Sequence, residues 1–128
     1  MNLEKIVSKM MTLNIQARLW HWMTDKAQHH TTFEQFLTQN ETLTDSFVES
    51  ALGNDFKINF KDLGVTEGKC KAYSIENSRS EIKNYRLAIA ETKGNLEKSD
   101  TFGSEELVTI LDDVVELTSK TLYLLSLN

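Results

Sequence analysis

The chain has 128 residues, of which 40% are hydrophobic and 26% are charged, and it contains no proline. This composition predicts one globular domain over residues 1–128, and the absence of proline favours a largely helical fold. The net charge of −5, without a basic run or tail, argues against nucleic-acid binding. We find no membrane-length apolar stretch and no signal peptide, and the single cysteine, Cys70, has no intrachain partner. We therefore expect a cytoplasmic protein without DNA or membrane partners.

Residues 3–23 have the first helical pattern. Their apolar side chains recur at steps of three and four and form one stripe. The stripe consists of Leu3, Ile6, Val7, Met10, Leu13, Ala17 and Trp20. Asn14 and His21 fall on the same stripe. Each of them needs a hydrogen-bond partner or a ligand, because burying an unpaired polar group costs free energy.

Residues 30–52 have the second helical pattern. Its apolar surface is made of Phe33, Phe36, Leu37, Leu43, Phe47, Val48, Ala51 and Leu52. Two starts are consistent with the sequence. Thr31 or Thr32 could cap the helix, or a very tight turn over residues 25–29 could join it to the first helix. We expect Gly53 to end the helix in a left-handed conformation.

Residues 53–71 lack a helical pattern. Phe56, Ile58 and Phe60 alternate with polar residues, which predicts a short extended segment with one face on the core. Such a long connection in a compact domain predicts a crossover from one end of the bundle to the other. The second and third helices would then run parallel.

Two more helices are predicted for residues 72–98 and 104–126. In the third, Ile75, Ile82, Ile89 and Leu96 repeat every seven residues around Tyr85. Ser104 is the expected N-cap of the fourth. The fourth helix has a broad apolar face of Leu107, Ile110, Leu111, Val114, Leu117, Thr121, Leu124 and Leu125. Its last turns, residues 122–127, should be docked in the bundle or in a subunit interface. The fold class is thus all-α, a four-helix bundle with a long crossover between helices 2 and 3.

The candidate functional residues cluster in the first two helices. They are Trp20, His21, Trp22, His29, His30, Glu34, Glu41, Asp45 and Glu49. At 100° per residue, the side chains of residues 30, 34, 41 and 45 fall within roughly 60° of one another. Asp45 and Glu49 are four residues apart, so their carboxylates can converge on one cation. Imidazole and carboxylate together suit Fe(II), Mn(II) or Zn(II).

The separation of these groups limits how they could form one site. His30 and Asp45 lie about 22 Å apart along one helix, so they cannot bind the same ion within one chain. They could meet if the second helix packs antiparallel to its own copy, which makes any shared site a dimer site. Ordinary roles are also consistent with the pattern: a solvated face for the carboxylates and packing for the tryptophans and His21.

Three stretches carry a family resemblance: residues 19–24 with His30, residues 44–53 and residues 120–127. They resemble a family of small tailed-phage proteins, which is itself similar to the Dps branch of the ferritin-like superfamily. The resemblance implies a ferritin-like bundle in the host cytoplasm. It also implies iron bound at a dimer interface by a His-Trp pair, a second histidine and an Asp-x-x-x-Glu. The corresponding residues here are His21, His30, Asp45 and Glu49, although His21 and His30 are closer in sequence than in Dps proteins.

Two functions remain as hypotheses. The first is an oligomer, at least a dimer through helix 2, that binds iron or another divalent metal. Such a protein could also oxidise the bound iron, as a ferroxidase does, but we favour metal binding without catalysis. The second is a non-enzymatic phage accessory or anti-defence protein that binds a host protein or sequesters a small nucleotide. Its binding surface would include Trp20, Trp22, His29 and His30, flanked by Glu34 and Glu41.

Overall fold

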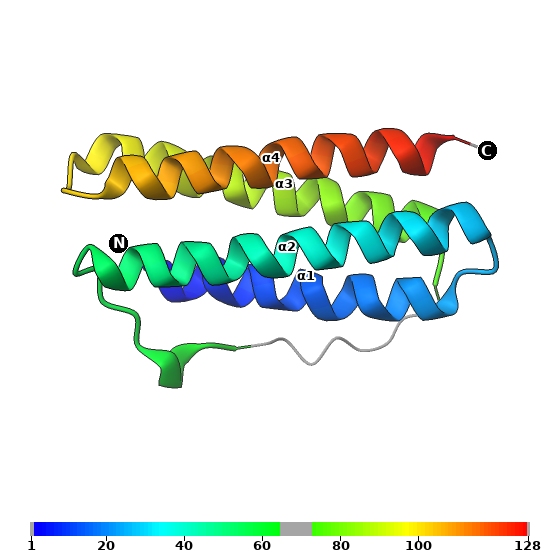
Figure 1. The fold of residues 1–128 in the computed structure, drawn as a ribbon, viewed down its shortest axis with the longest axis horizontal. Coiled ribbons are helices and arrows are strands. Elements are labelled where there is room, and N and C mark those ends of the chain that lie inside the picture. Colours follow the sequence, from blue (N-terminus) through cyan, green and yellow to red (C-terminus); the bar gives the residue numbers. More distant parts are fainter. Residues whose placement is uncertain (1, 65–72, 128) are drawn as a thin grey trace.

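The computed structural model describes residues 2–64 and 73–127, so Cys70 and the end of the predicted crossover lie outside the described residues. The elements are α1 (Leu3–Met23), α2 (Ala27–Gly53), the short 3₁₀ helix η1 (Phe60–Asp62), α3 (Ile75–Ser99) and α4 (Ser104–Ser126). The predicted all-α four-helix bundle is therefore confirmed (Figure 1).

Neighbouring helices of the bundle run antiparallel. The pairs α1–α2, α3–α4 and α2–α4 pack extensively, and α1–α3 is the sparsest of the four sides. In Figure 1, α1 and α4 run from left to right, and α2 and α3 run from right to left. The chain thus changes ends between α2 and α3, which are parallel as predicted. Antiparallel neighbours also place opposite ends of the helix dipoles side by side.

The predicted apolar stripes form the core. All seven members of the α1 stripe are buried, as are Ile82, Ile89 and Leu96 of α3. From α2 and α4 the core receives Phe33, Phe36, Leu37, Phe47, Ala51, Leu107, Leu111, Val114, Leu117 and Leu125. Leu52 is an error of the prediction, because 44% of its surface is exposed.

A polar network crosses the middle of this core. Asn40, fully buried on α2, donates from Nδ2 to the Met10 carbonyl (3.2 Å) and to Asn14 Oδ1 (2.9 Å). Its own Oδ1 accepts a 2.6 Å hydrogen bond from the Tyr85 hydroxyl. Thr44 donates to the Asn40 carbonyl at 2.7 Å. The network gives Asn14 the hydrogen-bond partner that its place on the apolar stripe called for. It also links α1, α2 and α3 near the middle of the bundle.

The start of α2 follows the tight-turn alternative. Residues 24–26 separate the two helices, and α2 begins at Ala27 with Lys26 as its N-cap. Thr31 and Thr32 do not cap the helix. Their hydroxyls donate to the carbonyls of Ala27 and Gln28 one turn earlier, as threonines inside a helix do.

The predicted end of α2 and the predicted start of α4 are confirmed to within one residue, but the predicted conformation of Gly53 and the predicted N-cap role of Ser104 are wrong. Gly53 is the last residue of α2, and the left-handed residue that follows is Asp55, with a φ of 62°. Ser104 is the first residue of α4, and its N-cap is Gly103, with a φ of 86°. Gly103 meets the Asn54 side chain, so the α3–α4 turn rests on the end of α2.

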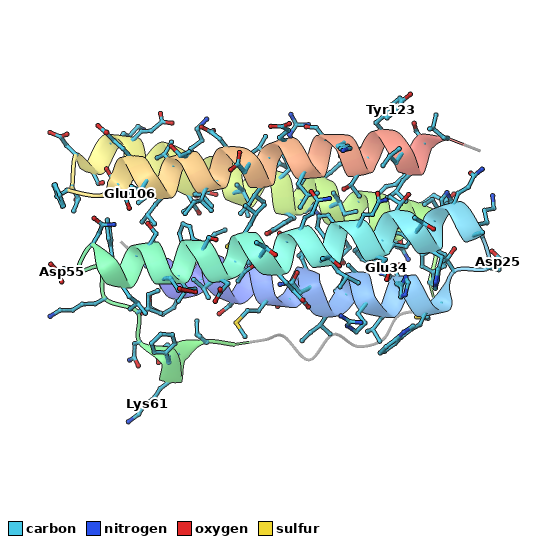
Figure 2. The ribbon with its side chains drawn as sticks, in the orientation of Figure 1. Asp25, Glu34, Asp55, Lys61, Glu106 and Tyr123 are labelled. Carbon is cyan, nitrogen blue, oxygen red and sulfur yellow. The ribbon has the colours of Figure 1, made fainter. Side chains whose placement is uncertain are left out.

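The junction between α2 and α4 is held by Glu106. Its Oε2 accepts hydrogen bonds from Ser50 Oγ (2.9 Å) and Asn54 Nδ2 (2.8 Å). Hydrogen bonds from Asn54 and Ser50 lower the pKa of this carboxyl. Figure 2 shows Glu106 where α4 begins beside the end of α2.

The described part of the crossover follows α1. The Asn59 amide donates to Glu4 Oε1 (2.8 Å), and the Gly64 amide donates to Ser8 Oγ (3.0 Å). Ile58 is buried and Phe56 is half-buried as predicted, but Phe60 starts η1 and is 55% exposed. The prediction that Phe60 belongs to the extended segment and faces the core is therefore wrong.

The remaining helix ends differ from prediction in smaller ways. α3 begins at Ile75 rather than near residue 72, because Ser74 caps it by accepting from the Asn77 amide (3.0 Å). At the end of α4, Leu125 is buried but Tyr123 is 63% exposed and points away from the bundle (Figure 2). The last turns of α4 are therefore only partly packed against the bundle.

In the described ranges, no helix combines the length and apolarity needed to span a membrane.

Candidate functional site

His21 and His30 face each other where α1 ends and α2 begins. Their rings are stacked, with centroids 3.7 Å apart and planes tilted by 23°. Nδ1 of His21 lies 2.8 Å from the His30 carbonyl oxygen, and Nδ1 of His30 lies 2.7 Å from the His21 carbonyl oxygen. We call this reciprocal arrangement the histidine clasp. It provides the partner that His21 required and ties the two helices together.

The histidine clasp determines which nitrogen of each ring would be free to bind a metal. A carbonyl oxygen only accepts hydrogen bonds, so both Nδ1 atoms carry a hydrogen and donate. The Nε2 atoms remain as the ligand atoms, and a backbone carbonyl on the other ring nitrogen is the usual support of a metal-binding histidine. However, a metal lies in the ring plane about 2.1 Å from the nitrogen. Two nearly parallel rings cannot both direct Nε2 at one ion without turning.

Asp45 and Glu49 form a second group, one turn apart on the exposed side of α2. A hydrogen bond and charge repulsion from Asp45 raise the pKa of Glu49. The two carboxyls therefore interact in the folded chain, as their spacing predicted. Together they attract a proton or another cation more strongly than either carboxylate would alone.

This repulsion predicts that Asp45→Asn raises the thermal midpoint at pH 7. A carboxyl whose pKa is raised by folding binds its proton more tightly in the folded chain, so the penalty is present at neutral pH. It disappears as the pH falls through the pKa of Glu49, and the gain should vanish below about pH 4. Thermal melts from pH 3 to 8 would measure this effect. Asp113→Asn, at an exposed α4 position, is the control. A lower midpoint for Asp45→Asn than for the control at pH 7 would contradict the prediction.

The other candidate residues are distributed between core and surface. Trp20 and His29 are buried, and both pack near Phe33, at ring distances of 5.5 and 6.4 Å. They do not belong to an exposed binding surface, which corrects the proposal from sequence. Trp22 is 64% exposed. Glu34 and Glu41 are exposed on α2, and Figure 2 shows Glu34 towards the end of the bundle that holds the α1–α2 turn.

Arg18 is a neighbour of this site that the sequence reasoning missed. Its guanidinium lies 5.8 Å from the Trp22 ring centroid and 3.8 Å from a Glu41 carboxylate oxygen. The spacing of Arg18 and Trp22, four residues apart on α1, was the available signal. Arg18 therefore lies over part of the tryptophan and forms an exposed ion pair with one of the α2 carboxylates.

The described residues of one chain do not assemble a complete metal site. They contain no group of three His, Cys, Asp or Glu side chains placed to bind one ion. No aspartate or glutamate is buried in the described ranges, so the core offers a metal no carboxylate ligand there. The histidine clasp and the Asp45–Glu49 pair are two separate polar groups towards opposite ends of α2.

These features define a four-helix bundle with a crossover between its second and third helices and two separate polar groups along its second helix. Comparison with known proteins gives no match to a family model, to a curated protein or to a solved structure.

Proposed function

We propose that the chain is a Dps-like member of the ferritin-like superfamily that pairs with a second copy through α2 and binds iron or another divalent metal between the copies. One observation carries the proposal. The exposed side of α2 has an imidazole half-site at His30 and a carboxylate half-site at Asp45 and Glu49. Each half-site alone has too few ligands, and each supplies what the other lacks.

An antiparallel α2–α2 pairing would join these half-sites. The twofold axis would pass midway between them, near residues 38–39, and would generate two equivalent sites per dimer. The same pairing brings Leu52 of one copy towards the α1–α2 turn of the other, beside Trp22. Both side chains are exposed and apolar, at 44% and 64%. Burying them would add an apolar contact at each end of a polar interface.

Within each site we assign different roles to the two histidines. His30 is the more exposed ring and is the ligand through Nε2. His21 is a positioning residue, because its stacked ring and its carbonyl fix the orientation of His30. Asp45 and Glu49 of the second copy supply two anionic oxygens, and a cation between them relieves the repulsion that raises the pKa of Glu49.

Zinc titration of EDTA-treated protein, followed by calorimetry and sedimentation velocity, tests this proposal. We expect two Zn²⁺ per dimer, and affinity reduced at least about tenfold by Asp45→Asn/Glu49→Gln or by His30→Ala. Asp113→Asn/Glu116→Gln removes the same charge from exposed α4 positions and should leave binding unchanged. A protein that stays monomeric and binds no zinc, or variants that bind as the native chain does, would refute the proposal.

A further inference from the structure

The side of the bundle between α1 and α3 contains a groove that the metal proposal does not use. Its volume is about 430 Å³, which is in the range of small-molecule sites. The groove exists because short side chains line its walls. Ser8 and Thr12 of α1 lie across from Ala88 and Thr92 of α3, and these residues are too small to fill the space between two helix backbones.

Two lysines give one wall of this groove a positive charge. Lys5 and Lys9 are one turn apart on α1, and Lys9 is half-buried. Neither forms a salt bridge within the described ranges, although the whole chain has a net charge of −5. Adjacent like charges on a helix are mildly destabilising. A ligand with two negative charges, such as a phosphate monoester, would remove that cost.

The rest of the lining favours a ligand that has polar and apolar groups in addition to its negative charge. Asn84 and Asn95 on α3 offer amide donors and acceptors, and Ile6 and Ala88 supply apolar surface. Glu91 also lines the α3 wall. Its carboxylate would repel a simple anion but would accept hydrogen bonds from hydroxyl groups. On the α1 side the lining extends from Asn2 to Thr12, which is about 15 Å along a helix.

We propose that this groove binds a nucleoside monophosphate. The phosphate lies at Lys5 and Lys9, the ribose hydroxyls lie at Glu91, and the base lies on the apolar floor within reach of the asparagine amides. Charge complementarity and the mixed lining carry this assignment, which does not depend on the metal site on α2.

Calorimetric titration with adenosine monophosphate and, separately, with inorganic phosphate tests the assignment. We expect AMP to bind at least about tenfold more tightly than phosphate, because base and ribose contribute. Lys5→Ala/Lys9→Ala should weaken AMP binding at least about tenfold. The control Lys83→Ala/Lys120→Ala removes two exposed lysines from α3 and α4 that do not line the groove, and it should change binding less than about twofold.

Ala88→Leu provides a second variant that fills the groove without changing its charge. It should abolish AMP binding while leaving the circular dichroism spectrum native. The proposal is overturned if AMP does not bind at millimolar concentration, or if phosphate binds as well as AMP. It is also overturned if both lysine pairs affect binding equally, since binding would then reflect general charge alone.

Discussion

Asn40→Leu should lower the free energy of unfolding by about 3 kcal/mol, one of the two largest effects that we expect from a single substitution. Leucine has the same number and branching of side-chain heavy atoms but cannot accept from Tyr85 or donate to Asn14 and Met10, which all lie within 3.2 Å of the Asn40 amide. The Tyr85 hydroxyl would remain in a core that already raises its pKa by burial. Chemical denaturation with urea would measure the loss.

A double-mutant cycle with Tyr85→Phe separates the network from simple packing. Phenylalanine removes the hydroxyl that leucine leaves unpaired, so Asn40→Leu/Tyr85→Phe should cost clearly less than the sum of the two single changes. An additive double mutant would mean that Asn40 and Tyr85 do not stabilise the bundle through their shared hydrogen bond. A native-like stability for Asn40→Leu alone would contradict the whole network.

Gly103→Ala is the second substitution with a large expected effect, a loss of about 2–3 kcal/mol. Gly103 has a φ of 86°, and a Cβ at this position would overlap the Asn54 side chain. Relief of that overlap would move Asn54 away from Glu106, its acceptor at 2.8 Å. The α3–α4 turn would then lose its contact with the end of α2.

Gly94→Ala is the matched control for that substitution. Gly94 lies inside α3, and a Cβ there would meet nothing within 4 Å apart from its chain neighbours and the backbone of its own helix. Alanine should therefore raise the free energy of unfolding by about 0.5–1 kcal/mol through helix propensity. Urea denaturation of both variants gives the comparison. Equal changes for the two variants would show that the conformation of Gly103 is not a constraint.

The sequence predicted the bundle because periodicity reports burial directly. The α1 stripe from Leu3 to Trp20 is buried at every position. Helix ends were harder to predict, since they depend on contacts between distant segments. Ser104 has the chemistry of an N-cap, yet the turn places Gly103 there because only glycine accommodates that φ beside Asn54. Similarly, Thr31 bonds back to Ala27 instead of capping α2.

The sequence indicated which residues belong to the candidate site but not which of them contact each other. The pattern indicated that His21 needed a partner, but periodicity could not identify His30, because their contact depends on the length of the α1–α2 turn. Periodicity did separate Trp20, which lies on the apolar stripe, from Trp22, which does not. These residues are 200° apart around a helix, so one is buried and the other is exposed. The interaction of Asp45 with Glu49 follows from their spacing alone, whereas their convergence on one cation stays a prediction.

The positions of His30 and of the Asp45–Glu49 pair explain why pairing is central to the proposed function. The middle of the bundle is occupied by the Asn40 network, and no carboxylate is buried in the described part of the chain. His30 and Asp45 are about 22 Å apart on one rigid helix, so bending α2 cannot join them. A second copy with an antiparallel α2 would bring both half-sites together at once.

Mixing two weakly binding variants tests this arrangement most directly. At a zinc concentration that half-saturates the native protein, His30→Ala and Asp45→Asn/Glu49→Gln should each bind little zinc, because each loses at least about tenfold in affinity. In a mixed dimer, one site combines the intact histidine of one copy with the intact carboxylates of the other. We therefore expect a mixture of the two variants to recover one zinc site of native affinity per mixed dimer. A mixture that binds no more zinc than its separate components, beside a native protein that binds it, would contradict a site shared between copies.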